Sequence, residues 1–137
     1  MKIGIVTGYF DPIHDGHIEL LEKSKSQVDK LIVVLNNDLQ TSAKKGKPFM
    51  EEKVKKRILE AIRYVDELWV SIDTTGGQCK TLIKIREKYP NDELTFFSGG
   101  DRDITNIPEF EVKDKINLKF VDGTGEKINS SRKYYSK

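Results

Sequence analysis

Short apolar runs alternate along the chain with segments of helical periodicity. The runs are rich in Val, Ile and Phe, as in strands that are buried on both faces, and they cover residues 2–7, 30–36, 68–72, 94–98 and 118–121. Between them, Ile18, Leu21 and Val28 predict one face of a helix that starts near Gly16. The other predicted helices cover Val54–Val65, with an apolar stripe of Val54, Ile58, Ala61, Ile62 and Val65, then Cys79–Tyr89, and a short segment after Pro108.

This β-α-β-α order predicts an α/β fold in which helices cover a parallel sheet. The length of 137 residues predicts a single domain spanning residues 1–137. In parallel sheets of this kind, ligands bind beyond the carboxyl ends of the strands. We therefore expect the chemistry in four polar, Gly-rich segments, which are residues 8–17, 36–48, 99–106 and 123–131.

The charge balance excludes one class of partner. The chain has 24 Lys and Arg against 22 Asp and Glu, a net charge of +2, whereas proteins that hold nucleic acid through bulk charge are strongly basic. Cys79 is the single cysteine, so an internal disulfide is impossible. The longest aliphatic run, Leu31–Leu35, is far too short to cross a bilayer. We expect a soluble cytoplasmic protein with no signal peptide, no membrane association and no nucleic-acid partner.

The strongest chemical signal is the sequence G-Y-F-D-P-I-H-D-G-H, which spans Gly8–His17 between the first strand and the first helix. His14 and His17 share a face at the helix start, and Gly16 leaves the backbone open to a ligand. The helix N-terminus adds unpaired N–H groups and a partial positive charge. Together these features predict a phosphate site. A metal site is the alternative, but no further ligands are placed nearby, and the histidines could also be ordinary surface or core residues.

This motif resembles the signature of nucleotidyltransferases with an H-x-G-H motif, and in particular of small cytidylyltransferases such as the glycerol-3-phosphate enzymes. Further similarity lies in residues 58–68, 96–102 and 126–131. The resemblance implies a Rossmann-like parallel sheet sandwiched by helices. It also implies that a phosphorylated sugar or polyol attacks the α-phosphorus of a nucleoside triphosphate, that pyrophosphate leaves, and that Mg²⁺ accompanies the triphosphate. Relatives are commonly dimers, so a homodimer is expected.

The resemblance also implies roles for individual residues. Catalysis is expected from His14, His17 and Lys44. Nucleotide binding is expected from Gly8, Tyr9, Phe10, Asp11, Gly16, Asp101, Asn129, Ser130 and Ser131, and acceptor binding from Lys47, Lys55, Arg63 and Arg102. None of these is expected to be a resident metal ligand, although Asp11 has two possible roles, fixing the loop or meeting the magnesium ion of the substrate. Arg63 has a structural alternative, which is to complement a helix C-terminus.

Some positions depart from the family pattern. Gly100 and Arg102 stand where the family usually has an aspartate and an aromatic residue, and Thr124 and Lys127 replace a usual Arg and Gly. CTP is the expected nucleotide, with two alternatives left open: an adenylyltransferase that uses ATP on a sugar phosphate of the heptose 1-phosphate type, and a non-catalytic nucleotide-binding module.

Positive charge is concentrated in one segment. Residues 44–57 contain seven basic and two acidic residues, a net +5, so the rest of the chain carries −3 of the total. This charge is expected to face a small polyanionic substrate.

Overall fold

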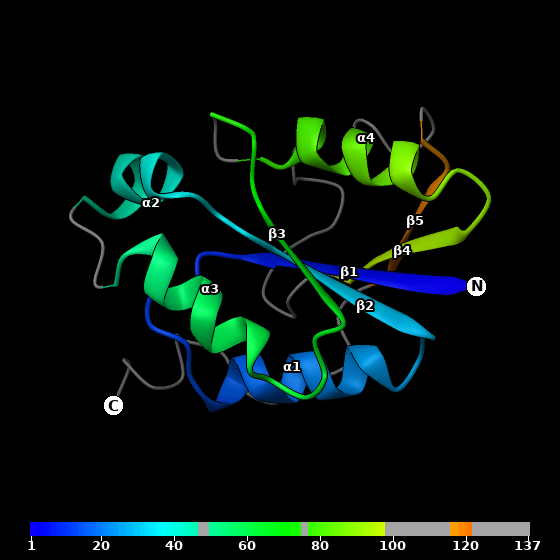
Figure 1. The fold of residues 1–137 in the computed structure, drawn as a ribbon, viewed down its shortest axis with the longest axis horizontal. Helices are drawn as coiled ribbons and strands as arrows, with labels where there is room; N and C mark the ends of the chain where they lie inside the picture. Colours follow the sequence, from blue (N-terminus) through cyan, green and yellow to red (C-terminus); the bar gives the residue numbers. More distant parts are fainter. Residues whose placement is uncertain (47–49, 75–76, 98–115, 122–137) are drawn as a thin grey trace.

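The computed structural model describes residues 1–46, 50–74, 77–97 and 116–121 (Figure 1). Five strands form one sheet in the order β3-β2-β1-β4-β5, and every neighbouring pair is parallel. The strands are β1 (Lys2–Gly8), β2 (Lys30–Leu35), β3 (Glu67–Val70), β4 (Glu93–Phe97) and β5 (Leu118–Val121). The helices are α1 (Asp15–Lys25), α2 (Asp38–Lys45), α3 (Glu52–Glu60) and α4 (Cys79–Lys88). The predicted α/β fold is confirmed.

Helices cover both faces of the sheet (Figure 1). On one face, Leu82 and Ile85 of α4 pack against Ile3, Ile5 and other residues of the strands. On the opposite face, α1 contributes Leu21 and α3 contributes Leu59 to a second core cluster. Alternate residues of β1 and β2 enter the two clusters, because successive side chains of a strand point to opposite faces. The sheet is therefore sandwiched between helices, as expected.

The edge strand β3 differs from its prediction. The apolar pattern placed a strand at residues 68–72, but β3 comprises Glu67–Val70, and Ile72 beyond it is 50% exposed. All four residues of β3 are half-buried. β3 pairs only with β2 among the described strands, so it does not have the full burial that its apolar composition indicated.

The predicted apolar stripe of the second helix is confirmed at its end, where Ile62 and Val65 pack against the second core cluster, and is wrong at its start. α3 ends at Glu60, and Val54, the first member of the predicted stripe, is 45% exposed. The buried positions of α3 are Lys55 and Leu59 instead. Because Lys55 is both buried and charged, a helix rotated to bury it cannot be identified from apolar spacing alone.

Helix α2 lies in a segment that the sequence pattern assigned to a loop. Asn37 is its N-cap, and the Asn37 side chain accepts a hydrogen bond from the Gln40 N–H (2.8 Å). The Gln40 side chain in turn accepts one from the Asn37 N–H (3.0 Å). This reciprocal pair is a capping box built from Asn and Gln, and it explains why a polar segment with little apolar periodicity begins a helix.

The strand order places a topological switch point at the carboxyl end of β1. The chain runs from β1 to β2 and then to β3, and it crosses to the other side of β1 to form β4. Connections therefore leave β1 and β4 in opposite directions, which is the topological switch point where ligands bind in such sheets. The segment that follows β1 at this point is the histidine-containing loop.

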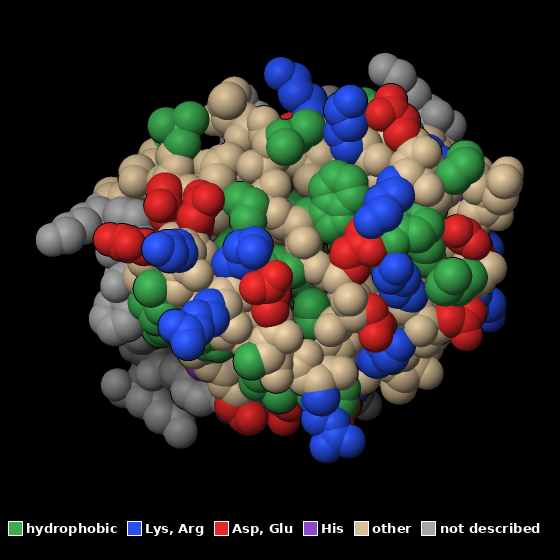
Figure 2. Space-filling model, in the orientation of Figure 1, with side chains coloured by type: hydrophobic (Ala, Val, Ile, Leu, Met, Phe, Trp, Pro, Cys, Tyr) green, Lys and Arg blue, Asp and Glu red, His purple; other side chains and the backbone are tan. Residues whose placement is uncertain are grey.

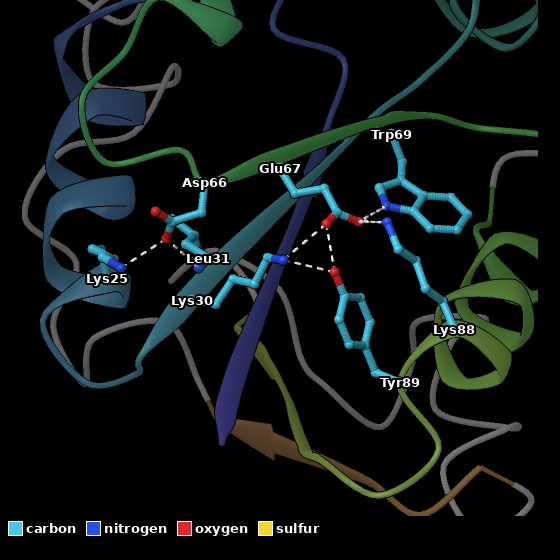
Figure 3. A network of polar contacts seen from close by, with 8 residues as sticks. All are labelled: Lys25, Lys30, Leu31, Asp66, Glu67, Trp69, Lys88 and Tyr89. Atoms are coloured by element: carbon cyan, nitrogen blue, oxygen red, sulfur yellow. Dashed lines mark hydrogen bonds and ion pairs between the residues drawn. The ribbon is translucent and has the colours of Figure 1, made fainter.

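At the amino ends of the strands, polar contacts join the start of β2 and β3 to α1 and α4 (Figure 3). Asp66 accepts hydrogen bonds from Lys25 Nζ (2.7 Å) and from the Leu31 N–H (2.8 Å). Glu67 accepts hydrogen bonds from Trp69 and Tyr89 and forms an ion pair with Lys30 (3.0 Å). These contacts lie where β2 and β3 begin, far along the strands from the loop after β1. None of the helices in the described part of the chain is long and apolar enough to cross a membrane.

Candidate active site

The two histidines are fixed to the first turn of α1 by their Nδ1 atoms. His14 is the N-cap of α1, with extended backbone, and its Nδ1 accepts a hydrogen bond from the Gly16 N–H (3.1 Å). The Nδ1 atom of His17 accepts one from the His14 N–H (3.0 Å). The histidines therefore satisfy N–H groups that every helix start leaves unpaired. This is the role that Ser, Asp or Asn usually takes.

These contacts determine which nitrogen carries the proton. A ring nitrogen that accepts a hydrogen bond has no hydrogen of its own, so in the neutral form the proton of each imidazole is on Nε2. Nε2 lies across the ring from the anchored Nδ1 atom. Both rings therefore direct an N–H donor away from the helix backbone. Two such donors beside a helix N-terminus suit the oxygens of a phosphate group.

The two rings are held parallel by packing. Their centroids are 3.9 Å apart and their planes differ by 23°. On its other side, His17 meets the edge of Phe10 at a centroid distance of 4.8 Å. Phe10 is 2% exposed, and its φ of 48° is in the left-handed region. For a residue with a bulky side chain this conformation costs about 1–3 kcal/mol, and such strain is found at functional loops. Phe10 thus supports the His17 ring from the protein interior.

A buried ion pair attaches the histidine loop to the protein interior. The Lys55 side chain is 1% exposed and that of Asp11 is 3% exposed, and Lys55 Nζ lies 3.8 Å from Asp11 Oδ1. Lys55 Nζ also donates a hydrogen bond to the Tyr9 carbonyl (3.1 Å), and Asp11 Oδ1 accepts one from the Met50 N–H (2.8 Å). α3 is therefore attached through Lys55 to the segment that presents the histidines.

The surroundings of Asp11 also bear on magnesium. Within the described ranges, no three His, Cys, Asp or Glu side chains form a group that could hold a metal ion. The Asp11 carboxylate faces an ammonium and a backbone N–H. Mg²⁺ commonly enters such sites on substrate phosphates, so we treat it as part of the triphosphate substrate.

The structure brings together only some of the predicted site residues. Gly8, Tyr9, Phe10, Asp11, His14, Gly16 and His17 all lie in the segment from the end of β1 to the first turn of α1. Lys44 lies in the last turn of α2. Arg63 is exposed in the connection between α3 and β3, where its guanidinium lies 5.6 Å from the centre of the Tyr64 ring. This connection leads into the amino end of β3, whereas the histidine loop follows the carboxyl end of β1. Within one chain, Arg63 is therefore not placed beside the histidines. Lys47, Asp101, Arg102, Asn129, Ser130 and Ser131 lie outside the described residues.

Two of the basic residues in the segment 44–57 do not contribute free positive charge to the surface. Lys55 is in the interior, and Lys56 on the surface pairs with Glu60 (3.3 Å). On the face over α3, β3 and α4, Lys and Arg side chains are interspersed with Asp and Glu (Figure 2). The described side chains of this face therefore do not form a patch of one sign.

Sequence reasoning missed a group of buried polar side chains near the carboxyl ends of β2 and β3. These side chains belong to Asn36, Gln40, Thr41, Ser71, Asp73, Gln78 and Thr81, and each is at most 5% exposed. They are far apart in the sequence, and only the Asn37–Gln40 capping box gave a local signal. The Asn36 N–H donates a hydrogen bond to the Gly8 carbonyl (2.9 Å), so this group adjoins the histidine loop.

Comparison with known proteins identifies the family of the chain. A family model described as cytidylyltransferase-like matches residues 5–123. The chain belongs to this family of nucleotidyltransferases. The matched range runs from β1 to just beyond β5 and includes the whole histidine loop. Membership therefore rests on the elements that build the fold and the site, and it confirms the resemblance stated from the sequence.

Individual relatives cover different shares of this cytidylyltransferase-like chain. Glycerol-3-phosphate cytidylyltransferase of Bacillus subtilis (strain 168) is 44% identical over 68 residues, which are 50% of this chain and 53% of the relative. The bifunctional protein HldE of Rhodopseudomonas palustris (strain BisB18) is 29% identical over 119 residues, 78% of this chain and 24% of the relative. The chain thus aligns with about half or less of either protein. The crystal structure of the lipopolysaccharide core biosynthesis protein from Thermoplasma volcanium GSS1 superposes with a TM-score of 0.67 at 27% identity, covering 90% of this chain and 98% of that one.

Proposed function

We propose that the protein transfers a nucleotidyl group, CMP from CTP, to a phosphorylated sugar or polyol such as glycerol 3-phosphate. A phosphate oxygen of the acceptor attacks the α-phosphorus of the triphosphate, the bond to the bridging oxygen breaks, and pyrophosphate leaves. The single observation that carries this proposal is the pair of stacked histidines, each held at Nδ1 so that its Nε2–H is directed away from the first turn of α1.

The reaction needs little covalent chemistry from the protein, because phosphoryl transfer depends mainly on positioning and on stabilising charge. The two Nε2–H groups donate hydrogen bonds to the triphosphate as negative charge moves toward the leaving pyrophosphate. A single preorganised donor of this kind contributes about 3 kcal/mol to lowering a barrier. The packing on Phe10 and the Lys55–Asp11 pair holds the donors before the substrate arrives. Lys44, Lys47 and Arg102 supply positive charge to the triphosphate and to the acceptor phosphate.

CTP is favoured by the half-chain similarity to a cytidylyltransferase for glycerol 3-phosphate. A second candidate is adenylyl transfer from ATP to a sugar phosphate, the alternative that the sequence resemblance left open. The longer alignment with the bifunctional protein HldE, which covers 78% of this chain, shows that the similarity is not confined to the cytidylyltransferase for glycerol 3-phosphate. Both candidates use the same histidine pair. They differ in the nucleoside and in the acceptor, which contact other parts of the site.

The deciding experiment measures pyrophosphate release with CTP or ATP against a panel of sugar and polyol phosphates, together with calorimetric binding of each nucleotide in the presence of magnesium. We expect release with CTP and a polyol phosphate, and tighter binding of CTP than of ATP. Release with ATP alone would establish the adenylyltransferase. Binding of a nucleotide without release for any pair would indicate a non-catalytic binding module.

A further inference from the structure

The buried polar side chains at the carboxyl ends of β2 and β3, here called the β2–β3 polar cluster, form hydrogen bonds with one another and with nearby backbone groups. The Asp73 carboxylate accepts hydrogen bonds from the N–H groups of Lys80 and Thr81 (2.9 Å each) and from the Thr81 hydroxyl (2.6 Å). Asp73 therefore satisfies the N–H groups at the start of α4. Its carboxylate serves the helix rather than a ligand.

The side-chain amides of the cluster and of the neighbouring Asn37 also form hydrogen bonds. The Asn37 side-chain NH₂ donates to the carbonyls of Ser71 (3.0 Å) and Asp73 (2.9 Å). The Gln40 carbonyl oxygen accepts from Asn36 Nδ2 (3.2 Å) and from the Asn37 N–H, while Gln40 Nε2 donates to the Gly77 carbonyl (3.2 Å). α2 is thereby bonded to the segment that precedes α4.

Gln78, the N-cap of α4, is the exception. Its side chain is 1% exposed, and in the part of the chain that the structure describes its Oε1 atom meets no hydrogen-bond donor. The only other buried side-chain atom in that condition among the described residues is Ser24 Oγ in α1. Burying a carbonyl oxygen without a partner is unfavourable, and natural proteins rarely do so without a reason. Local rules of stability are typically broken at functional sites.

We propose that Gln78 is a specificity residue of the nucleotidyltransfer site and that its Oε1 accepts a hydrogen bond from a neutral donor group of a substrate. This inference rests on the function proposed above. An amide oxygen can only accept, so its partner must be a donor. Ionised phosphate oxygens accept rather than donate. The partner is therefore a hydroxyl or amino group on the nucleoside or on the sugar or polyol acceptor.

The position of Gln78 supports this assignment. It begins the helix that follows β3, and the β2–β3 polar cluster meets the histidine loop through the Asn36–Gly8 hydrogen bond. A substrate whose phosphates lie at the start of α1 extends its neutral part over an adjoining strand end. Oε1 then selects substrates by the presence of one donor. Sites built to hydrogen-bond a substrate group reject analogues that lack the group far more strongly than apolar pockets reject a missing methylene.

The test compares Gln78→Met with the wild type and with Ser24→Ala. Methionine has a similar length and no strong acceptor, so Gln78→Met removes the unpaired oxygen. We expect its Tm to rise while the KM of one substrate increases about tenfold. Ser24→Ala is the matched control, because it removes the other unpaired buried oxygen from α1. It is expected to raise Tm without changing either KM. Whether the nucleotide KM or the acceptor KM moves shows which substrate supplies the donor.

A second experiment tests substrate analogues with the wild type and with Gln78→Met. Deoxy analogues of the nucleotide and of the acceptor, each lacking one hydroxyl, and UTP, which lacks the amino group of CTP, are compared with the parent compounds. We expect one of them to show a KM at least about tenfold higher in the wild type and no such penalty in Gln78→Met. Unchanged KM values in an active Gln78→Met enzyme, or equal use of every analogue by the wild type, would overturn the inference alone. A wild type without pyrophosphate release would overturn the proposed function and the inference with it.

Discussion

The Lys55 ammonium and the Asp11 carboxylate form an ion pair across 3.8 Å with almost no exposure to solvent. The pair joins α3 to the loop that presents both histidines. Charges are rarely buried to this extent unless they are paired, because removal from water is unfavourable for each ion. We therefore infer that the main effect of the pair is to fix the position of the loop, and that its net contribution to the stability of the fold is small.

Loss of one partner is expected to be harmful. Lys55→Met leaves the Asp11 carboxylate buried without its cation, which typically reduces the free energy of unfolding by about 3–5 kcal/mol. Adding Asp11→Asn removes the uncompensated charge and should restore part of that loss. Urea unfolding of both single variants and the double variant measures the coupling. Strictly additive losses would show that the two charges do not interact.

His17 is expected to affect catalysis much more than stability if the Nε2–H group is the functional donor. His17→Asn keeps an acceptor near the position of Nδ1, which can still bond the His14 N–H. It lacks the second donor across the ring. We expect kcat/KM to fall at least about a hundredfold, as for loss of an oxyanion donor, with a Tm close to that of the wild type. His17→Ala, which also loses the N–H contact, should show the same kinetic loss and a lower Tm. A normal rate for His17→Asn would contradict the proposed role.

Two reciprocal hydrogen bonds join the N-termini of helices α2 and α3. The Glu52 carboxylate accepts from the Asp38 N–H (2.8 Å), and the Asp38 carboxylate accepts from the Glu52 N–H (2.9 Å). Each substitution by alanine is expected to reduce the free energy of unfolding by about 1 kcal/mol, the usual effect of losing a cap. Thermal unfolding of Asp38→Ala, Glu52→Ala and the double variant gives the coupling. Glu60→Ala is a suitable control, because its exposed contact with Lys56 should contribute less.

The fold and the histidine loop could be predicted because their signals are local. A buried strand of a parallel sheet is a short apolar run, and the first loop carries its glycines and both histidines within ten residues of each other. The helix α2 was missed because its N-terminal signal is a capping box of Asn37 and Gln40 rather than an apolar stripe. A capping box is also a local signal, but Asn and Gln occur in many polar segments that do not begin a helix, so these residues alone do not identify one.

The contacts that complete the site could not be predicted because they join distant segments. Apolar spacing places Val54 in the core, whereas the structure buries Lys55, and only the position of Asp11 under the loop explains why. The β2–β3 polar cluster likewise depends on pairs such as Asn37 with Ser71, 34 residues apart. Spacing along the chain gives no information about such pairs until the register of β2 and β3 is known.

Glu67 predicts how stability depends on pH. Burial by itself raises the pKa of this carboxyl, but hydrogen bonds from Tyr89, Trp69, Lys30 and Lys88 outweigh that effect and lower the pKa from 4.5 to about 2 (Figure 3). Because the folded pKa is below the unfolded one, the contribution of Glu67 is complete above pH 4.5 and is lost as pH falls toward 2. Glu67→Gln should therefore lower Tm at pH 7, and the difference from the wild type should shrink between pH 4.5 and 2. A difference that is the same at both ends of this range would show that the effect does not come from the carboxylate charge.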